Sequence, residues 1–236
     1  MKTKDIIEQN NIKREELTPE NLKVYEEVLM YLRCDLSLSE RVTEVTLMDL
    51  LDHLLEAQMH DVTTEEFFGP DPKQFAKDLV EEIPKESKRN IWMFTASIFC
   101  FLLALFRAIS GIADLIIVYI LKRKNITDIG GEFTGNLLTS TIICLIIFGV
   151  FKYMQSTAFI DLENETKAKK FKLFIIMWFV MVIPFLVSLF IHRIIHIGPM
   201  VEIPWYINFI IALVLYLLYK LLFNASRNDK EVAIFR

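Results

Sequence analysis

Two charged side chains stand out in or beside the first long apolar run of the chain. Arg107 and Asp114 interrupt an otherwise apolar stretch that begins at Ile91. A charge in such a stretch is costly to place in lipid, and this makes it a candidate for transport, proton relay or a buried ion pair. The two residues are seven apart, or two helical turns, so they share one face if the helix continues. We favour a structural ion pair or a helix interface over a transport site.

The histidines offer the remaining candidate chemistry. His192 and His196 have the i, i+4 spacing of a two-histidine metal site, but no cysteine or group of carboxylates nearby completes it. His53 and His60 lie among acidic residues, a pattern that acid–base catalysis and an ordinary surface helix share. The chain has no phosphate-binding glycine loop, nucleophile elbow or paired-cysteine motif. We therefore expect no metal, no cofactor, no catalytic residue and no enzyme activity.

Charge and hydrophobicity divide the chain into two parts. Hydrophobic residues make up 53 % of the 236 positions, unevenly distributed. Residues 1–90 contain 12 Lys/Arg and 21 Asp/Glu, a net charge of −9, whereas residues 91–236 contain 14 and 9, a net charge of +5. An acidic, water-soluble head joined to an apolar body is typical of a membrane protein. Nucleic acid is an unsuitable partner, because an acidic head repels phosphates.

Cysteine usage and the N-terminus indicate where such a chain is found. Cys34, Cys100 and Cys144 cannot all pair with one another, and two of them lie in apolar runs. Free thiols in a reducing cytosol or in lipid fit this pattern best. The first 17 residues contain no apolar core of a signal peptide. We expect the later apolar segments to direct membrane insertion.

Helix-start signals predict a small all-α domain over 17–88, preceded by a tail at 1–16. Thr18, followed by a proline and an acid, predicts a helix over about 19–33. The sequence Ser37-Leu38-Ser39-Glu40 has the form of a capping box and predicts a long helix that ends near His60. Helices this short are marginal alone, so they must pack together.

Two further start signals lie close together at the end of this domain. Thr63 and Glu66 form a second capping-box pattern, and Asp71-Pro72 restarts a helix directly after a Gly-Pro stop. The aromatic side chains beside these signals are the expected core anchors, although a partner-binding groove is the alternative. They are Phe67, Phe68 and Phe75.

Four apolar segments predict a transmembrane domain over 89–225, followed by a tail at 226–236. A spanning helix needs about 20 apolar residues. The predicted spans are 91–110, 136–154, 171–194 and 205–223. Segment 111–121 is too short to cross alone, which leaves a re-entrant piece, an interfacial piece or a continued tilted helix open. Gly131 and Gly135 have the spacing of a helix-dimer motif, but they fall in a predicted polar loop.

The basic residues of the short loops predict the orientation. Lys and Arg precede the first predicted span, flank the loop between the second and third, and occupy the C-terminal tail. Four spans with both termini in the cytoplasm satisfy this distribution. The triplet Lys122-Arg123-Lys124 opposes it, because this topology places the triplet outside.

A family resemblance follows from residues 36–85, LSLSERVTEVTLMDLLDHLLEAQMHDVTTEEFFGPDPKQFAKDLVEEIPK. A helix ending in D-x-L-x-E-A, a turn with paired acids and aromatics, and then G-x-D-P resemble the HAAS-type helical domain. The whole layout is similar to a Gram-positive family of multi-span membrane proteins of unknown function. The resemblance implies that Asp71 and Pro72 start a helix, and it implies a signalling or accessory role. Asp61 departs from it, standing where glycine is the more natural helix stop.

These observations predict a bacterial plasma-membrane protein that acts through protein contacts. Its all-α fold comprises a cytosolic helical head and a bundle of about four membrane helices. The expected partners are the lipid bilayer and a cytosolic or membrane protein, with homo-oligomerisation left open. The alternative is a small transporter, permease subunit or immunity-type membrane protein, in which Arg107 and Asp114 line a path.

Overall fold

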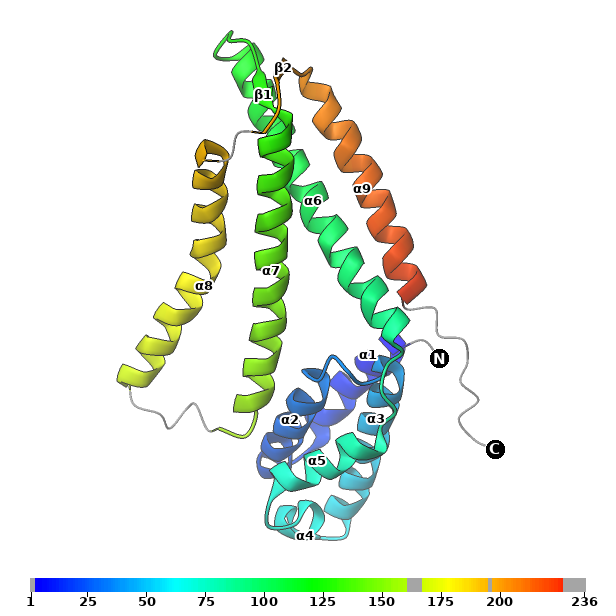
Figure 1. Ribbon diagram of the computed structural model, residues 1–236. Helices are drawn as coiled ribbons and strands as arrows, with labels where there is room; N and C mark the ends of the chain where they lie inside the picture. Colours follow the sequence, from blue (N-terminus) through cyan, green and yellow to red (C-terminus); the bar gives the residue numbers. More distant parts are fainter. Residues whose placement is uncertain (1–2, 161–166, 195–196, 227–236) are drawn as a thin grey trace. The chain divides into compact units, whose positions relative to one another are not determined.

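The structure is a computed structural model that describes residues 3–160, 167–194 and 197–226. It confirms the predicted all-α class, with short N-terminal helices followed by long apolar ones (Figure 1). The described residues form two compact units. The head unit contains residues up to 91 together with 149–160, and the body unit contains 92–148 and the described residues from 167 to 226.

The head unit is built from six short helical elements and the end of a long one. Its elements in chain order are α1 (Thr3–Lys13), the 3-10 helix η1 (Arg14–Glu16), α2 (Pro19–Arg33), α3 (Glu40–Met59), α4 (Thr64–Phe68) and α5 (Pro72–Glu82). Apolar side chains of α2 and α3 are fully buried between the helices, because each helix has one apolar stripe. The largest of them are Tyr25, Leu32, Leu47, Leu51 and Leu54.

Helix caps explain the sharp turns around α4 and α5. The Thr63 hydroxyl accepts from Glu66 N, and the Glu66 carboxylate accepts from Thr63 N, which completes the predicted capping box. These two hydrogen bonds lower the pKa of Glu66. Asp71 caps α5 by accepting from Lys73 N and Gln74 N, with Pro72 at the first helical position.

Two predictions for the head are wrong. Residues 1–16, predicted as a tail, contain α1 and η1, because Ile6 and Asn10 of α1 are buried by the head. Ser37 does not cap the long helix: Ser39 is the N-cap residue, without a side-chain hydrogen bond, and the Ser37 hydroxyl donates to Asp35 at 2.6 Å. A local serine–aspartate turn therefore competes successfully with the capping box.

Two hydrogen bonds fix a tyrosine in the centre of the head. The Tyr25 hydroxyl accepts from Asn10 Nδ2 at 2.5 Å and donates to the Leu47 carbonyl at 2.9 Å, so it connects α1, α2 and α3. Burial raises the pKa of Tyr25 to about 12. The neutral phenol is therefore the form that the folded head accommodates.

Replacing Tyr25 with phenylalanine is expected to lower the stability of the head by about 1–3 kcal/mol at neutral pH, because Asn10 and Leu47 lose a buried partner. The raised pKa of Tyr25 contributes stability that is fully present below the unfolded pKa of about 10. This contribution is lost as the pH rises towards the folded pKa of about 12. The variant's deficit should therefore shrink above pH 10. Hydrogen exchange of α2 and α3 amides in the full chain, measured in detergent micelles, checks both expectations; a deficit that grows above pH 10 contradicts them.

Two residues of the head have a positive φ angle, and substituting them is expected to change the stability of the head in opposite directions. Asp61 follows α3 at φ 56°, and Gly69 follows α4 at φ 77°. Asp61→Gly should stabilise the head by about 0.5–1 kcal/mol, because glycine adopts this conformation without strain. Gly69→Ala should destabilise it by about 1–3 kcal/mol, although nothing lies within 4 Å of an added Cβ. The same exchange measurement checks both signs, and equal signs contradict the reasoning.

The body unit is dominated by long apolar helices. They are α6 (Lys88–Tyr119), α7 (Ile129–Thr157), α8 (Lys167–Ile194) and α9 (Trp205–Ser226); the first turn of α6 and the last two turns of α7 belong to the head unit. Two short antiparallel strands, β1 (Ile126–Asp128) and β2 (Met200–Glu202), pair with Ile126 opposite Glu202. In Figure 1, α6, α7 and α9 come together at the end that carries these strands.

Three of these helices are long and apolar enough to cross a membrane: α6, α7 and α9. Each includes one predicted span, at 91–110, 136–154 and 205–223. The predicted span at 171–194 lies within α8, whose described apolar part is Phe174–Pro184, and the helix continues through Pro184. Segment 111–121 belongs to α6 as far as Tyr119, so the continued helix is the correct alternative.

Side-chain contacts show that α6 and α9 run antiparallel. Ring centroids of Phe94 and Phe223 lie 6.4 Å apart at one end, and those of Tyr119 and Trp205 lie 6.1 Å apart at the other. Between these ends, Gly111 faces the ring of Phe209, to which an added Cβ would come within 3.0 Å. This close approach brings together the polar side chains of the two helices.

Candidate functional site in the membrane body

Arg107 is paired inside the body unit. Its Nη1 atom lies 3.1 Å from Glu132 Oε1 of α7 and donates to Asn208 Oδ1 of α9 at 3.2 Å. The side chains of Arg107 and Glu132 are only 11 % and 14 % exposed. A shielded pair of this kind is electrostatically stronger than one on a wet surface, although desolvation offsets part of the gain.

Asp114 lies two turns further along α6 and is connected to the same group. It is 8 % exposed, and its Oδ2 atom accepts from Asn208 Nδ2 at 2.7 Å. The amide of Asn208 therefore bridges the two charges, with its oxygen on Arg107 and its nitrogen on Asp114.

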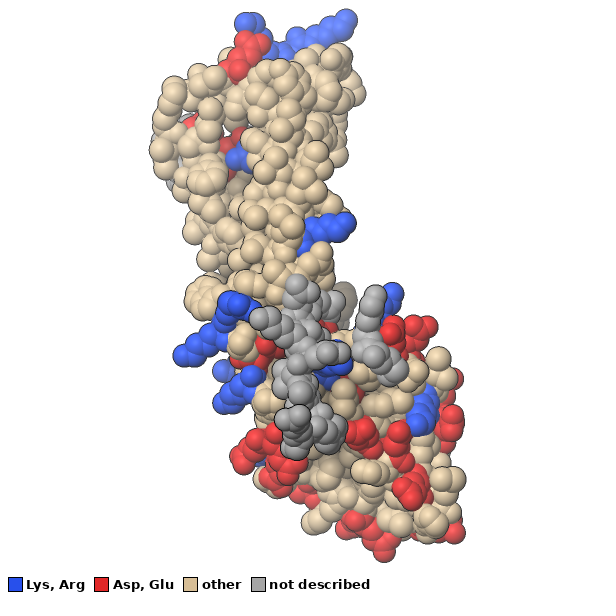
Figure 2. Space-filling model, turned by 90° about the vertical axis from the view of Figure 1, so that its right-hand side faces the viewer, with Lys and Arg blue, Asp and Glu red and all other residues tan. Residues whose placement is uncertain are grey.

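We call Arg107, Asp114, Glu132 and Asn208 the polar centre. It draws on α6, α7 and α9, so it ties together parts of the body that are distant in the sequence. Figure 2 shows blue and red atoms recessed among tan ones in the body. With one guanidinium and two carboxylates, the centre can hold helices in register or bind a cation or proton.

The apolar surroundings of Arg107 and Asp114 identify both residues as candidates but do not identify their partners. Glu132 is predicted to lie in a polar loop, whereas α7 begins at Ile129 and places Glu132 in its first turn. Gly131 and Gly135 are likewise buried in this helix and not in a loop. Asn208 was treated as part of an apolar span. An amide inside such a run is itself a signal, since intramembrane polar groups need partners.

Further polar side chains are buried on the same face of α7. Thr139 donates to the Gly135 carbonyl at 2.9 Å, which satisfies its hydroxyl within the helix. Asn136 Nδ2 and Ser140 Oγ are buried and have no hydrogen-bond partner among the described residues. These two groups leave hydrogen-bonding capacity unused on the face of α7 that also carries Glu132.

The candidate residues of the head occupy structural positions. Phe68 is buried, and its ring packs edge-on against Phe67 at 4.9 Å and Phe75 at 5.3 Å between centroids. Asp71 and Pro72 form the start of α5. All five therefore make packing or capping contacts within the head.

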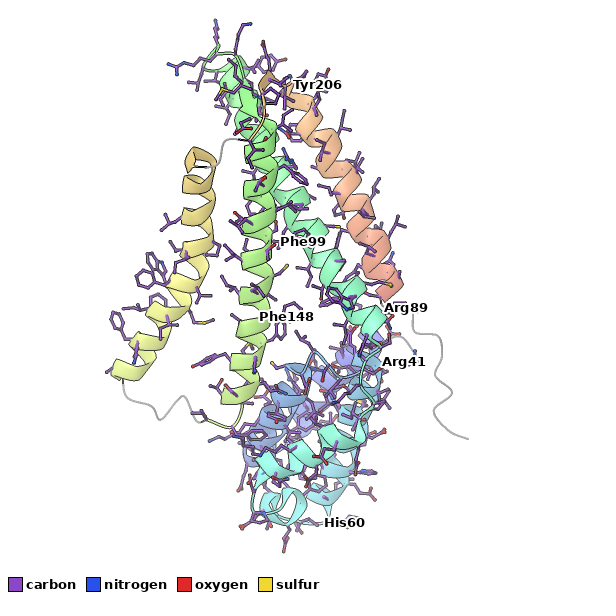
Figure 3. The ribbon with its side chains drawn as sticks, viewed as in Figure 1. Arg41, His60, Arg89, Phe99, Phe148 and Tyr206 are labelled. Carbon is purple, nitrogen blue, oxygen red and sulfur yellow. The ribbon has the colours of Figure 1, made fainter. Side chains whose placement is uncertain are left out.

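The structure places two of the four histidines, His53 and His60, on the surface of the head. His60, labelled in Figure 3, follows α3 on the surface of the head, and His53 is also exposed. The neighbouring Asp52 carboxylate pairs with Lys13 of α1. His196 and the side chain of His192 lie outside the described residues. Within the described part of the chain, no group of three metal-ligating side chains occurs.

The far end of α7 packs on the head. Phe159 lies against Tyr31, with ring centroids 5.6 Å apart, and joins the head core. Gln155 Nε2 donates to Asp35 Oδ2 at 3.2 Å and to the Tyr31 carbonyl at 3.4 Å. One continuous helix therefore carries Glu132 of the polar centre near its start and the head-packing Gln155 near its end.

Comparison with known proteins agrees with this architecture. Residues 25–226 match the family described as "Protein of unknown function (DUF1129)". No curated protein and no solved structure matches the chain. Since the match covers most of the 236 residues and three helices are suited to cross a bilayer, the chain is a multi-pass membrane protein that belongs to the DUF1129 family.

Proposed function

We propose that this protein transmits the state of its membrane body to a cytosolic, HAAS-type helical head that acts on another protein. The observation that carries the proposal is the placement of α7. Its first turn provides Glu132 to the polar centre, and Gln155 near its end donates to the Tyr31 carbonyl of α2 in the head. A continuous helix that participates in two packed sites can pass a displacement from one to the other.

The surface charge of the head supports a role in protein contacts. Its exposed residues include many carboxylates, of which Glu65, Glu81 and Glu82 lie on or beside α4 and α5. Charged surfaces of this kind set partner choice and association rate. In the proposed topology, the head and both termini lie in the cytoplasm of a bacterial cell.

Capture of partners by the full chain tests the proposed role of the head. Membrane extracts are compared after affinity purification of the wild type and of the variant Glu65→Gln, Glu81→Gln, Glu82→Gln. A matched control, Lys73→Gln with Lys77→Gln, changes exposed charges of the opposite sign on α5. We expect at least one protein whose recovery falls about tenfold with the acidic variant and stays unchanged with the control, as removal of steering charges predicts. Equal recovery with all three proteins rejects the head as a docking surface.

A small transporter or permease subunit is the second candidate. Asn136 Nδ2 and Ser140 Oγ favour it, because buried polar groups without partners in a membrane helix commonly face a solute path. In that case Asp114→Asn should abolish solute or proton flux in proteoliposomes while the head stays folded. Unchanged flux and folding remove this candidate.

A further inference from the structure

A pocket lies at the end of the body where α6 ends and α9 begins. Its volume is about 610 Å³, and we call it the interface pocket. It is lined by Val118, Lys122, Arg123, Lys124, Asn125, Glu202, Ile203, Pro204 and Trp205. This size falls within the range of about 300–1,000 Å³ that is typical of small-molecule sites.

The interface pocket is basic on one side. Lys122, Arg123 and Lys124 are all exposed, and the positive φ of Lys122, 50°, turns the chain there. Lys124 pairs with Glu202 at 3.2 Å across the pocket, but both side chains are more than half exposed. Within the described residues, the side chains of Lys122 and Arg123 make no ion pair. Figure 2 shows blue side chains gathered at this end of the body.

Aromatic and apolar side chains adjoin the basic wall. Trp205 packs edge-on against Tyr119 and Phe209, with centroids 6.1 Å apart in each case, and Tyr206 extends from the start of α9 (Figure 3). Tryptophan and tyrosine concentrate where a membrane helix meets the headgroups. Below them, exposed Ile116 on α6 and Ile210 on α9 offer apolar surface to acyl chains.

The preference for basic residues on the cytoplasmic side does not by itself explain the position of Lys122, Arg123 and Lys124. Lys88 and Arg89 lie at the start of α6, and the triplet follows the end of this helix, which is 32 residues or about 48 Å long. The two ends of a crossing helix face opposite sides, so the preference for cytoplasmic basic residues accounts for only one of these clusters. A binding role accounts for the other.

We propose that the interface pocket binds the phosphate headgroup of an anionic glycerophospholipid. Lys122 and Arg123 contact the phosphate, Trp205 lies at the level of the glycerol backbone, and the acyl chains run along α6 and α9. A lipid fits better than a soluble phosphate because cationic, aromatic and apolar surfaces follow one another along the same two helices.

Native mass spectrometry of the full chain in a neutral detergent tests the proposal, with phosphatidylglycerol and phosphatidylcholine titrated separately. Each basic residue near an anionic lipid contributes about a fivefold change in affinity, so Lys122→Gln with Arg123→Gln should weaken phosphatidylglycerol binding about 25-fold. Glu202→Gln should strengthen it about fivefold by the same reasoning. The charge-conserving variant Lys122→Arg with Arg123→Lys should retain binding, which separates charge from folding.

The matched control is Lys88→Gln with Arg89→Gln, an exposed pair of the same charge at the start of α6. Its affinity for phosphatidylglycerol should stay within about twofold of the wild type, since it lies far from the pocket and is screened. Three outcomes overturn the proposal: equal loss in the control and the pocket variant, equal wild-type affinity for both lipids, or displacement of phosphatidylglycerol by millimolar inorganic phosphate. The last outcome assigns the pocket to a soluble phosphate.

Discussion

Replacing Arg107 with leucine is expected to destabilise the body unit by about 3–5 kcal/mol, the usual effect of removing one member of a buried ion pair. The substitution leaves Glu132 shielded without a countercharge and removes the donor to Asn208. Unfolding of the full chain in mixed micelles of mild and denaturing detergent measures the loss.

Two further variants distinguish this explanation from a general effect of the substitution. Arg107→Leu combined with Glu132→Leu should recover most of the loss, because no unpaired charge remains. Lys220→Leu is the matched control on α9, where the side chain is exposed, and should change stability by less than about 0.5 kcal/mol. If Arg107→Leu alone unfolds at the same proportion of denaturing detergent as the wild type, the polar centre as described is contradicted.

Replacing Gly130 with alanine is expected to cost about 3 kcal/mol or more, at the upper end of overpacking effects. An added Cβ would lie 2.1 Å from the carbonyl oxygen of Ile197, and backbone cannot move aside as a side-chain tip can. The clash should also break the hydrogen bond from Ile197 N to Asp128 Oδ2, now 2.9 Å, and loosen the pairing of β1 with β2.

Gly149 provides the matched control within the same helix. Nothing lies within 4 Å of a Cβ added there, so Gly149→Ala should leave stability unchanged or raise it by about 0.5–1 kcal/mol. Hydrogen exchange of residues 126–128 in both variants gives the comparison. Slow exchange in the Gly130 variant, equal to that in the Gly149 variant, contradicts the close approach of α7 to residue 197.

Local sequence rules predicted the head where the signals are backbone hydrogen bonds. Thr63, Glu66 and Asp71 cap their helices as expected, because capping depends on residues within three positions. The helix α1 was missed since its pattern is weak and its burial rests on long-range partners, notably the bond from Asn10 to Tyr25. No local window contains that contact.

Part of the polar centre is predictable from the sequence, whereas the rest depends on contacts between distant parts of the chain. Arg107 and Asp114 are conspicuous because the residues around them are apolar. Their partners come from α7 and α9, and the hydrogen bonds of Asn208 span 101 and 94 positions of the chain. Polarity within apolar runs identifies candidates for such contacts, whereas the pairing itself depends on helix packing.

The proposed transmission from the polar centre to the head through α7 can be tested directly. Hydrogen exchange of residues 31–35 is measured in full-length protein in lipid nanodiscs, for the wild type and for Glu132→Gln, with and without Phe159→Ala. We expect Glu132→Gln to speed hydrogen exchange at residues 31–35, and we expect no such increase when Phe159→Ala is already present. Faster exchange confined to residues 92–148, with 31–35 unchanged, would show that the head does not respond to the polar centre.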